Sequence, residues 1–179
     1  MTNGFAANGF AVRFWGPFSA LGFAAAAIAL GLDQATKLWL LFAFHLGDKG
    51  VVAVAPFIDF VLTWNTGISY GLFQNEGEFA RWFWFAVKLI AASVLWLWLA
   101  RVHTRFSAIG LGLIIGGALG NAVDRLAYGA VADFVLFHIE TAGWRFNWYV
   151  FNLADAAIVA GVALLLYESI FADRAAKAP

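Results

Sequence analysis

Three aspartates of this chain lie in or beside strongly apolar stretches, where a charged side chain is hard to accommodate. Asp124 follows GGALGNAV, Asp133 lies in GAVADFVLF, and Asp155 lies in FNLADAAIVAG. An ionised carboxylate in the apolar part of a bilayer costs from about 3 to more than 10 kcal/mol. Such side chains persist where they are paired, where they face water, or where they carry out chemistry. These three residues are therefore the first candidates for a functional site.

Asp133 and Asp155 are suited to act as a pair. Two carboxyl groups held close together do not both ionise easily, so one keeps its proton and its pKa rises. The ionised partner can then activate a water molecule, while the protonated one donates a hydrogen bond to a carbonyl oxygen. That is the chemistry of peptide hydrolysis by an aspartic pair. On these aspartates alone, a structural role such as capping the start of a helix explains them equally well.

Two further groups of charged residues have simple explanations beside the functional one. Asp124 and Arg125 are adjacent, so they do not share a helix face and each is expected to have its own partner. Arg125 could pair with a carboxylate of the site or with a lipid phosphate, although a charged pair at the level of the lipid headgroups explains both residues better. Asp33 and Lys37 are four residues apart in acid-before-base order, which predicts an ion pair within a helix. A functional role would place this ion pair at the lip of the site.

The elements that must hold these residues are predicted to span a membrane. The chain has 179 residues, of which 63% are hydrophobic and 12% are charged, against about 45–50% and about 25% in an ordinary soluble domain. Four stretches approach the roughly 20 apolar residues that a transmembrane helix needs. They are residues 18–41, 82–100, 106–123 and 150–171. The first is interpreted as a retained span rather than a cleavable signal peptide, because its apolar run is long, no A-x-A-like site ends it cleanly, and three further spans follow.

Between the predicted spans, residues 51–73 and 126–149 are rich in apolar, β-branched and aromatic residues, which predicts short strands. Strands cannot expose open edges to lipid, so we expect a small sheet on the membrane surface, over the helix ends. The predicted fold class is an all-α integral membrane protein with four transmembrane helices and a small extracytoplasmic β-sheet or loop region. We expect residues 1–179 to form a single membrane-embedded domain.

The Lys and Arg residues between the spans predict the orientation of the chain. The N-terminus, residues 101–105 and the C-terminal tail would lie on the cytoplasmic side. With that topology, the polar residues that are hardest to explain converge on the outer side of the membrane. They are Asp33, Asn65, Asn121, Asp124, Arg125, Asp133, Asn152 and Asp155. This convergence predicts a single site.

Several other kinds of site find no support in the sequence. The formal net charge is zero, so no basic surface for nucleic acid is expected. His45, His103 and His138 are scattered without metal-ligand spacing and the chain has no Cys, so we expect no metal. No G-x-S-x-G motif or phosphate-binding glycine loop is present, and no cofactor is expected. Glycines that recur every fourth residue in the third predicted span indicate close helix packing instead. These are Gly112, Gly116 and Gly120.

Five short segments together resemble the bacterial lipoprotein signal peptidases, also called signal peptidase II. In chain order they are DQATK at 33–37, NTGISYG at 65–71, GNAVDR at 120–125, VADF at 131–134 and FNLAD at 151–155. Each segment alone is weak support. All five occur in the order and spacing of the family, along almost the whole chain.

The resemblance implies a membrane peptidase that acts on diacylglyceryl-modified prolipoproteins and cuts just before the lipidated lipobox cysteine. It implies that Asp133 and Asp155 are the catalytic aspartates. The positions that would bind substrate or inhibitor are Asn65, Gly67, Asn121, Arg125 and Asn152, and those that would support the site are Asp33, Lys37, Asp124 and Ala154. It further implies contact with membrane lipids, inhibition by globomycin-type compounds, and a multi-pass location in the bacterial plasma (inner) membrane. Both termini would be cytoplasmic and the site would lie near the outer, periplasmic face.

Two departures from the family pattern concern substrate preference rather than the reaction. Ile68 stands where a small residue is common, and the segment 138–150 between the two aspartates is rather long and aromatic. Neither departure falls on the motifs that carry Asp133 and Asp155. We therefore expect the chemistry to be kept and the shape of the substrate pocket to differ.

Two other classes of function are alternatives. A small proton-coupled transporter would use intramembrane aspartates as a proton relay. It would spread polar residues through the depth of the bilayer, however, and no inverted repeat is apparent in this sequence. A structural subunit would use the aspartates only to pair helices, so that Asp→Asn changes would disturb assembly and not catalysis.

Overall fold

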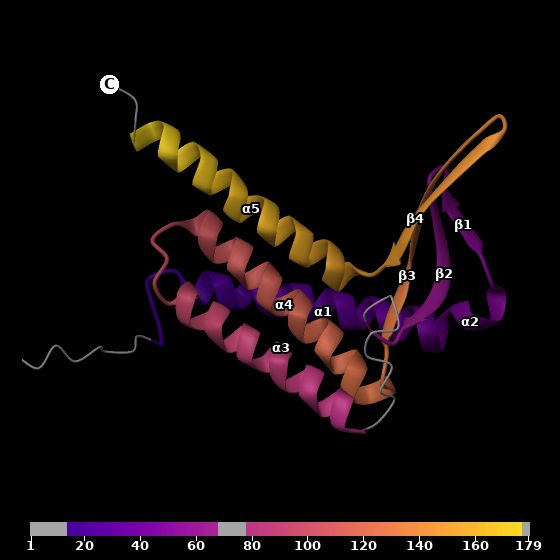
Figure 1. Cartoon of the computed structure of the whole chain (residues 1–179), viewed down its shortest axis with the longest axis horizontal. Coiled ribbons are helices and arrows are strands. Elements are labelled where there is room, and N and C mark those ends of the chain that lie inside the picture. The colour runs from indigo at the N-terminus through magenta and orange to yellow at the C-terminus, as the bar shows by residue number, and fades with distance from the viewer. Residues whose placement is uncertain (1–13, 68–77, 177–179) are drawn as a thin grey trace, which may run out of the picture.

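A computed structural model describes residues 14–67 and 78–176, apart from a few side chains. In these ranges long helices form a bundle, and a four-stranded sheet lies beyond one end of it (Figure 1). The helices are α1 (Ser19–Leu38), continued by the π-helix η1 (Trp39–Ala43), the short α2 (Leu46–Lys49), α3 (Glu78–Leu99), α4 (Arg105–Tyr128) and α5 (Leu153–Ala176). The strands are β1 (Val52–Ala55), β2 (Ile58–Asn65), β3 (Val131–Thr141) and β4 (Trp144–Phe151).

Within the described residues, three helical segments are long and apolar enough to cross a membrane: Ser19–Ala43, Arg105–Tyr128 and Leu153–Phe171. They correspond to the predicted spans at 18–41, 106–123 and 150–171. Helix α5 begins later than predicted because β4 continues to Phe151. The predicted span at 82–100 coincides with α3, but its apolar stretch among the described side chains, Leu89–Leu99, is too short to qualify. A fourth span therefore stays a prediction.

Helix α4 packs against α1, α3 and α5, and its glycines allow very close approach. A Cβ atom added at Gly116 would lie 2.4 Å from the carbonyl oxygen of Ala26 in α1, and one at Gly117 would lie 2.4 Å from that of Ala154 in α5. No side chain fits in either space. The close packing predicted from the glycine repeat is thus confirmed at Gly116, and α1 and α5 pack closely on two different faces of the same helix.

The sheet brings the two halves of the chain together. Its strands are antiparallel in the order β1-β2-β3-β4, and they confirm the strands predicted in 51–73 and 126–149 as far as these residues are described. The turn from α4 into β3 uses Gly129, whose φ of 76° favours glycine. At the other end only Asn152 separates β4 from α5. Asp133 in β3 and Asp155 in α5 are therefore both carried by elements that meet at one corner of the sheet.

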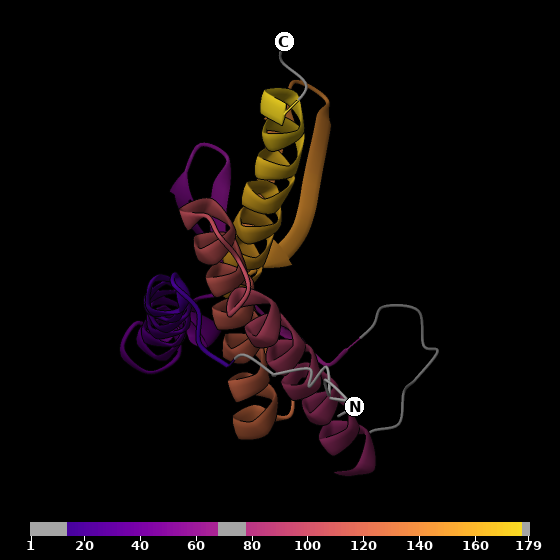
Figure 2. The same ribbon diagram turned by 90° about the vertical axis from the view of Figure 1, so that its left-hand side faces the viewer.

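An apolar cluster fixes the sheet to the end of α1. Phe134 of β3 is buried together with Leu40 of η1 and Leu46 of α2. Phe60 of β2 meets Phe134 edge to face, with ring centroids 6.1 Å apart. Because Phe134 follows Asp133 directly, this packing also fixes the position of the aspartate. The first and last described residues lie at the opposite end of the bundle from the sheet (Figure 1, Figure 2).

Candidate active site

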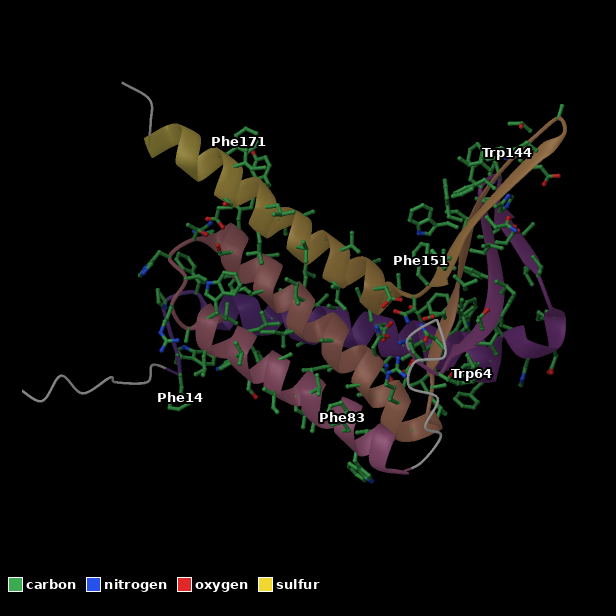
Figure 3. All side chains as sticks on the ribbon, viewed as in Figure 1. Phe14, Trp64, Phe83, Trp144, Phe151 and Phe171 are labelled. Atoms are coloured by element: carbon green, nitrogen blue, oxygen red, sulfur yellow. The ribbon has the colours of Figure 1, made fainter. Side chains whose placement is uncertain are left out.

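Polar side chains gather between the start of α5, the ends of α1 and α4, and the sheet (Figure 3). Most of the residues that the sequence predicted to converge are buried here. The buried members are Asp33, Asn121, Asp124, Asp133 and Asn152, while Asp155 and Arg125 are partly buried and Asn65 is exposed. Lys37 and Ala154, which were expected to support the site, are buried as well. The predicted convergence is therefore found in the structure.

Asn152 is hydrogen-bonded to both Asp133 and Asp155. Its side-chain Nδ2 donates to Oδ1 of Asp133 at 2.6 Å, and its backbone N–H donates to Oδ2 of Asp155 at 3.2 Å. The N–H of Asp155 donates in return to Oδ1 of Asn152 at 3.0 Å. These two reciprocal bonds cap the N-terminus of α5. The capping role considered for the aspartates is thus correct for Asp155, and the same asparagine links it to Asp133.

Asn121 of α4 supplies a second amide. Its Nδ2 donates to Oδ1 of Asp155 at 2.8 Å, and its Oδ1 accepts from Nδ2 of Asn152 at 3.0 Å and from Nζ of Lys37 at 3.3 Å. Because two donors face the amide oxygen, the amide nitrogen must face Asp155. Both oxygens of Asp155 therefore accept hydrogen bonds.

Asn65 and Gly67 lie at the end of β2, beside Asp133. Asn65 Nδ2 donates to Oδ2 of Asp133 at 3.1 Å, and its Oδ1 accepts from the N–H of Gly67 at 3.1 Å. This turn needs a φ of 143° at Gly67, a conformation that glycine tolerates and other residues avoid. The departure at Ile68 lies outside the described residues.

The environment of Asp133 favours its protonated form more than water does. The residue is 3% exposed, and burial raises the pKa of its carboxyl group. The negative charge of Asp155 acts in the same direction, whereas the hydrogen bonds from Asn65 and Asn152 and the charge of Lys37 oppose it. Burial dominates, so the pKa of Asp133 lies above that of an ordinary aspartate.

A buried cluster of charges lies next to this pair. Nζ of Lys37 is 2.8 Å from Oδ2 of Asp33 and 2.8 Å from Oδ2 of Asp124, and none of the three side chains is more than 2% exposed. The predicted ion pair between Asp33 and Lys37 is confirmed. The pair is buried rather than at the lip of the site, and Asp124, for which a charged pair at headgroup level was the simpler interpretation, is buried in the same cluster. A carboxylate removed from water needs a buried cation, and Lys37 serves both.

Each carboxylate of this cluster also holds the backbone next to one aspartate of the pair. Oδ1 of Asp33 accepts the N–H of Ala154, at 2.9 Å, and Oδ2 of Asp124 accepts the N–H of Ala132, at 3.0 Å. Ala154 directly precedes Asp155, and Ala132 directly precedes Asp133. The buried charges thus determine where the two aspartates lie.

Gln34 is a member of the cluster that the sequence analysis missed. Its Nε2 lies within hydrogen-bond distance of Oδ2 of Asp33 at 3.1 Å, Oδ1 of Asp124 at 3.0 Å and the carbonyl oxygen of Gly120 at 3.1 Å. The available signal was its place directly after Asp33 in the DQATK segment. An uncharged amide beside an ion pair did not stand out, because two of its three acceptors, on Gly120 and Asp124, come from another helix.

Arg125 differs from the other charged residues of the site. Its charge interacts with Asp133, Asp124 and Asp155, yet within the described part of the chain its guanidinium forms no ion pair. The half-buried side chain is thus positioned near the carboxylates without being neutralised by direct contact. Among the described residues, no group of three or more His, Cys, Asp or Glu is arranged to hold a metal ion.

Comparison with known proteins gives a consistent result. The sequence model of a family described as Signal peptidase (SPase) II matches residues 25–171. Proteins named lipoprotein signal peptidase from Rhodopseudomonas palustris (strain TIE-1) and Nitrobacter hamburgensis are each 60% identical to this chain, over 89% and 88% of it and 97% and 96% of their own lengths. A solved structure described as a bacterial membrane enzyme matches with a TM-score of 0.69 and 25% identity, covering 89% of this chain and 92% of that one.

Proposed function

Because this chain belongs to the signal peptidase II family, whose members are proteases, we propose that it is a membrane-embedded aspartic peptidase with Asp133 and Asp155 as its catalytic pair. Its substrates are prolipoproteins that carry a diacylglyceryl group on the lipobox cysteine. The enzyme cleaves the peptide bond just before that cysteine and so releases the signal peptide. The observation that carries this proposal is the contact of Asn152 with both aspartates.

The surroundings of the two aspartates suit different roles. Asp133, whose pKa is raised by burial, holds the proton and donates a hydrogen bond to the carbonyl oxygen of the scissile bond. Asp155 is the base. It lies in the first turn of α5, where the helix dipole favours a negative charge, and both of its oxygens accept hydrogen bonds.

The reaction then follows general acid–base catalysis. Asp155 takes a proton from a water molecule, and the resulting hydroxide attacks the carbonyl carbon while Asp133 protonates the carbonyl oxygen. Collapse of this tetrahedral intermediate breaks the C–N bond, and the leaving nitrogen takes the proton that Asp155 gained. The hydroxyl proton of the intermediate returns to Asp133. The products are a signal peptide with a new carboxyl terminus and a lipoprotein with a free amine on its cysteine.

The buried cluster around Lys37 supports the pair by positioning it. Through Asp33 and Asp124 it fixes the backbone before each aspartate, and through Asn121 it orients the amide that faces Asp155. Preorganised hydrogen bonds of this kind lower the barrier because they need not rearrange during the reaction.

The substrate approaches at the sheet end of the bundle. The residues that would contact the peptide backbone of the substrate or a nearby lipid phosphate are Asn65, Gly67 and Arg125. The amides of Asn121 and Asn152 would contact the substrate only next to the two aspartates. The two acyl chains of the substrate remain in the lipid. A globomycin-type inhibitor would compete for the same residues.

This function also sets the orientation. The enzyme lies in the bacterial plasma membrane with both termini in the cytoplasm and with the sheet and the site at the outer face. The concentration of polar residues at one end of the bundle supports this arrangement better than a proton relay, which would need polar residues through the depth of the membrane. Family membership likewise does not favour a transporter.

Cleavage of a purified diacylglyceryl-modified prolipoprotein tests the proposal. We expect Asp133→Asn and Asp155→Asn each to lose activity by a factor on the order of 10² or more. Asp48→Asn, a change of an exposed aspartate in α2, is the matched control and should cleave normally. All variants should melt cooperatively in detergent. Near-normal cleavage by either site variant would show that the pair is wrongly assigned.

A further inference from the structure

The hairpin of β3 and β4 extends beyond the rest of the sheet. The register of β2 with β3 ends at the pair Ile58 and Phe137, whereas β3 and β4 remain paired as far as Thr141 and Trp144. Residues 139–146 therefore form a two-stranded ribbon with no neighbouring strand in the described structure (Figure 1). A two-stranded hairpin by itself is only marginally stable in water. This ribbon is thus expected to lie against another surface.

The two faces of the ribbon differ in chemistry. Directly paired residues share a face, so Ile139 and Phe146 lie on the same face as Thr141 and Trp144. Trp144 and Phe146 stack at 5.8 Å, and Phe146 and Trp148 are 5.9 Å apart. Trp144 and Trp148 are nevertheless 57% and 55% exposed. Side chains alternate along a strand, so Glu140, next to Ile139 and Thr141, stands on the opposite face.

The aromatic face points toward the space beside α5. Figure 3 shows Trp144 and Phe151 on the side of the hairpin that faces back toward this helix. The hairpin and α5 leave the bundle on the same side and diverge from each other (Figure 1, Figure 2). Only 11% of the apolar segment of α5 is buried. Since that segment is long enough to span a membrane, the space between it and the hairpin is where lipid would lie.

We propose that the ribbon of residues 139–146, together with Trp148, is a lipid-binding surface that rests on the membrane at the sheet end of the molecule. Its aromatic face lies at the level of the headgroups, where Trp side chains are favoured, and its polar face is turned to water. We expect lipid rather than a protein partner on the aromatic face. A protein partner would have to occupy the space beside α5 that the bilayer fills. This role is separate from the proposed reaction.

Site-directed labelling tests the proposal, and the chain has no cysteine that would interfere. The variants Thr141→Cys and Glu140→Cys place a bimane fluorophore on adjacent residues of opposite faces. Each full-length protein is reconstituted into nanodiscs of phosphatidylcholine and phosphatidylglycerol. The measurements are quenching by brominated phosphatidylcholine in the disc and by iodide in solution.

We expect brominated lipid to quench the label at 141 several-fold more strongly than the label at 140, and iodide to show the reverse order. Iodide quenching of both labels with no effect of the lipid would place the ribbon in water and overturn the proposal. Protection of the label at 141 from both quenchers would indicate a second copy of the chain on this face and would also overturn it.

The label itself is apolar, so a second comparison is needed. Adding Trp144→Ser and Phe146→Ser to the Thr141→Cys variant removes the aromatic face but keeps the label. Lipid quenching at 141 should then fall several-fold. Unchanged quenching would show that the label, and not the aromatic face, contacts the lipid.

Discussion

The two aspartates of the proposed catalytic pair lie in different surroundings. Asp133 lies in a strand at 3% exposure, where burial raises its pKa. Asp155 lies in the first turn of a helix and accepts hydrogen bonds on both oxygens. The two residues are chemically identical, so this difference arises entirely from the elements that carry them.

The contact between Asn65 and Asp133 leads to a prediction about pH dependence. The hydrogen bond from Asn65 stabilises the ionised carboxylate and so lowers the pKa of Asp133. In Asn65→Ala that pKa should rise, and Asp133 should keep its proton to higher pH. If Asp133 is the acid, activity is lost on the basic side as this proton leaves. The basic limb of the profile of kcat/KM against pH should therefore move to higher pH, as measured on a modified prolipoprotein.

Thr66→Ala is the control for this change. Thr66 is also exposed and directly follows Asn65, so its substitution alters the same turn without removing a donor to Asp133. The basic limb of the pH profile of Thr66→Ala should match that of the protein without substitutions. A basic limb in Asn65→Ala that stays in place or moves to lower pH would contradict the assigned role of Asp133.

At the scale of the elements, the start of α5 serves both the fold and the site. Asn152 caps this helix and also donates to Asp133, whereas Thr104 caps α4 at the opposite end of the bundle. Loss of either cap should cost about 1 kcal/mol of stability. Asn152→Ala should in addition lose most of its cleavage activity, and Thr104→Ala should not. Thermal melts and cleavage rates of the two variants separate the roles, and equal activities would show that Asn152 only caps.

The packing of α4 on α1 gives a second prediction about the elements. A Cβ atom at Gly116 would lie 2.4 Å from the backbone oxygen of Ala26, whereas one at Gly31 would have no atom within 4 Å. Gly116→Ala should therefore destabilise the protein by about 1–3 kcal/mol. Gly31→Ala should leave the melting temperature unchanged or raise it, because alanine favours a helix by up to about 1 kcal/mol. Equal melting temperatures for both variants would mean that the helices separate easily at Gly116.

For the whole molecule, the placement of the termini and the sheet at opposite ends sets the expected topology (Figure 1). Single cysteines at His103, in the turn before α4, and at Asp48, in α2, mark the two ends of the bundle. In intact cells a membrane-impermeant maleimide should label Asp48→Cys and should label His103→Cys only after permeabilisation. Labelling of the cysteine at 103 in intact cells would reverse the proposed orientation.

The sequence by itself determined the features that depend on nearby residues. The apolar runs of α1, α4 and α5, the strands in residues 51–73 and 126–149, and the ion pair between Asp33 and Lys37 follow from hydropathy, alternation and the spacing of a helix. The five segments likewise identified the family, which the comparisons confirm. The catalytic roles of Asp133 and Asp155 stay predictions, because neither the fold nor the comparisons test them.

Only the tertiary structure decided which distant groups share these residues. Lys37 is buried between two carboxylates, Gln34 bridges them, and each carboxylate holds the backbone before one aspartate. All three arrangements depend on how closely α1, α4 and α5 approach one another. That approach depends on backbone contacts at glycines, which local spacing indicates but does not position. The projecting aromatic ribbon also could not be foreseen, because the strand that stops short of it lies far from it in the sequence.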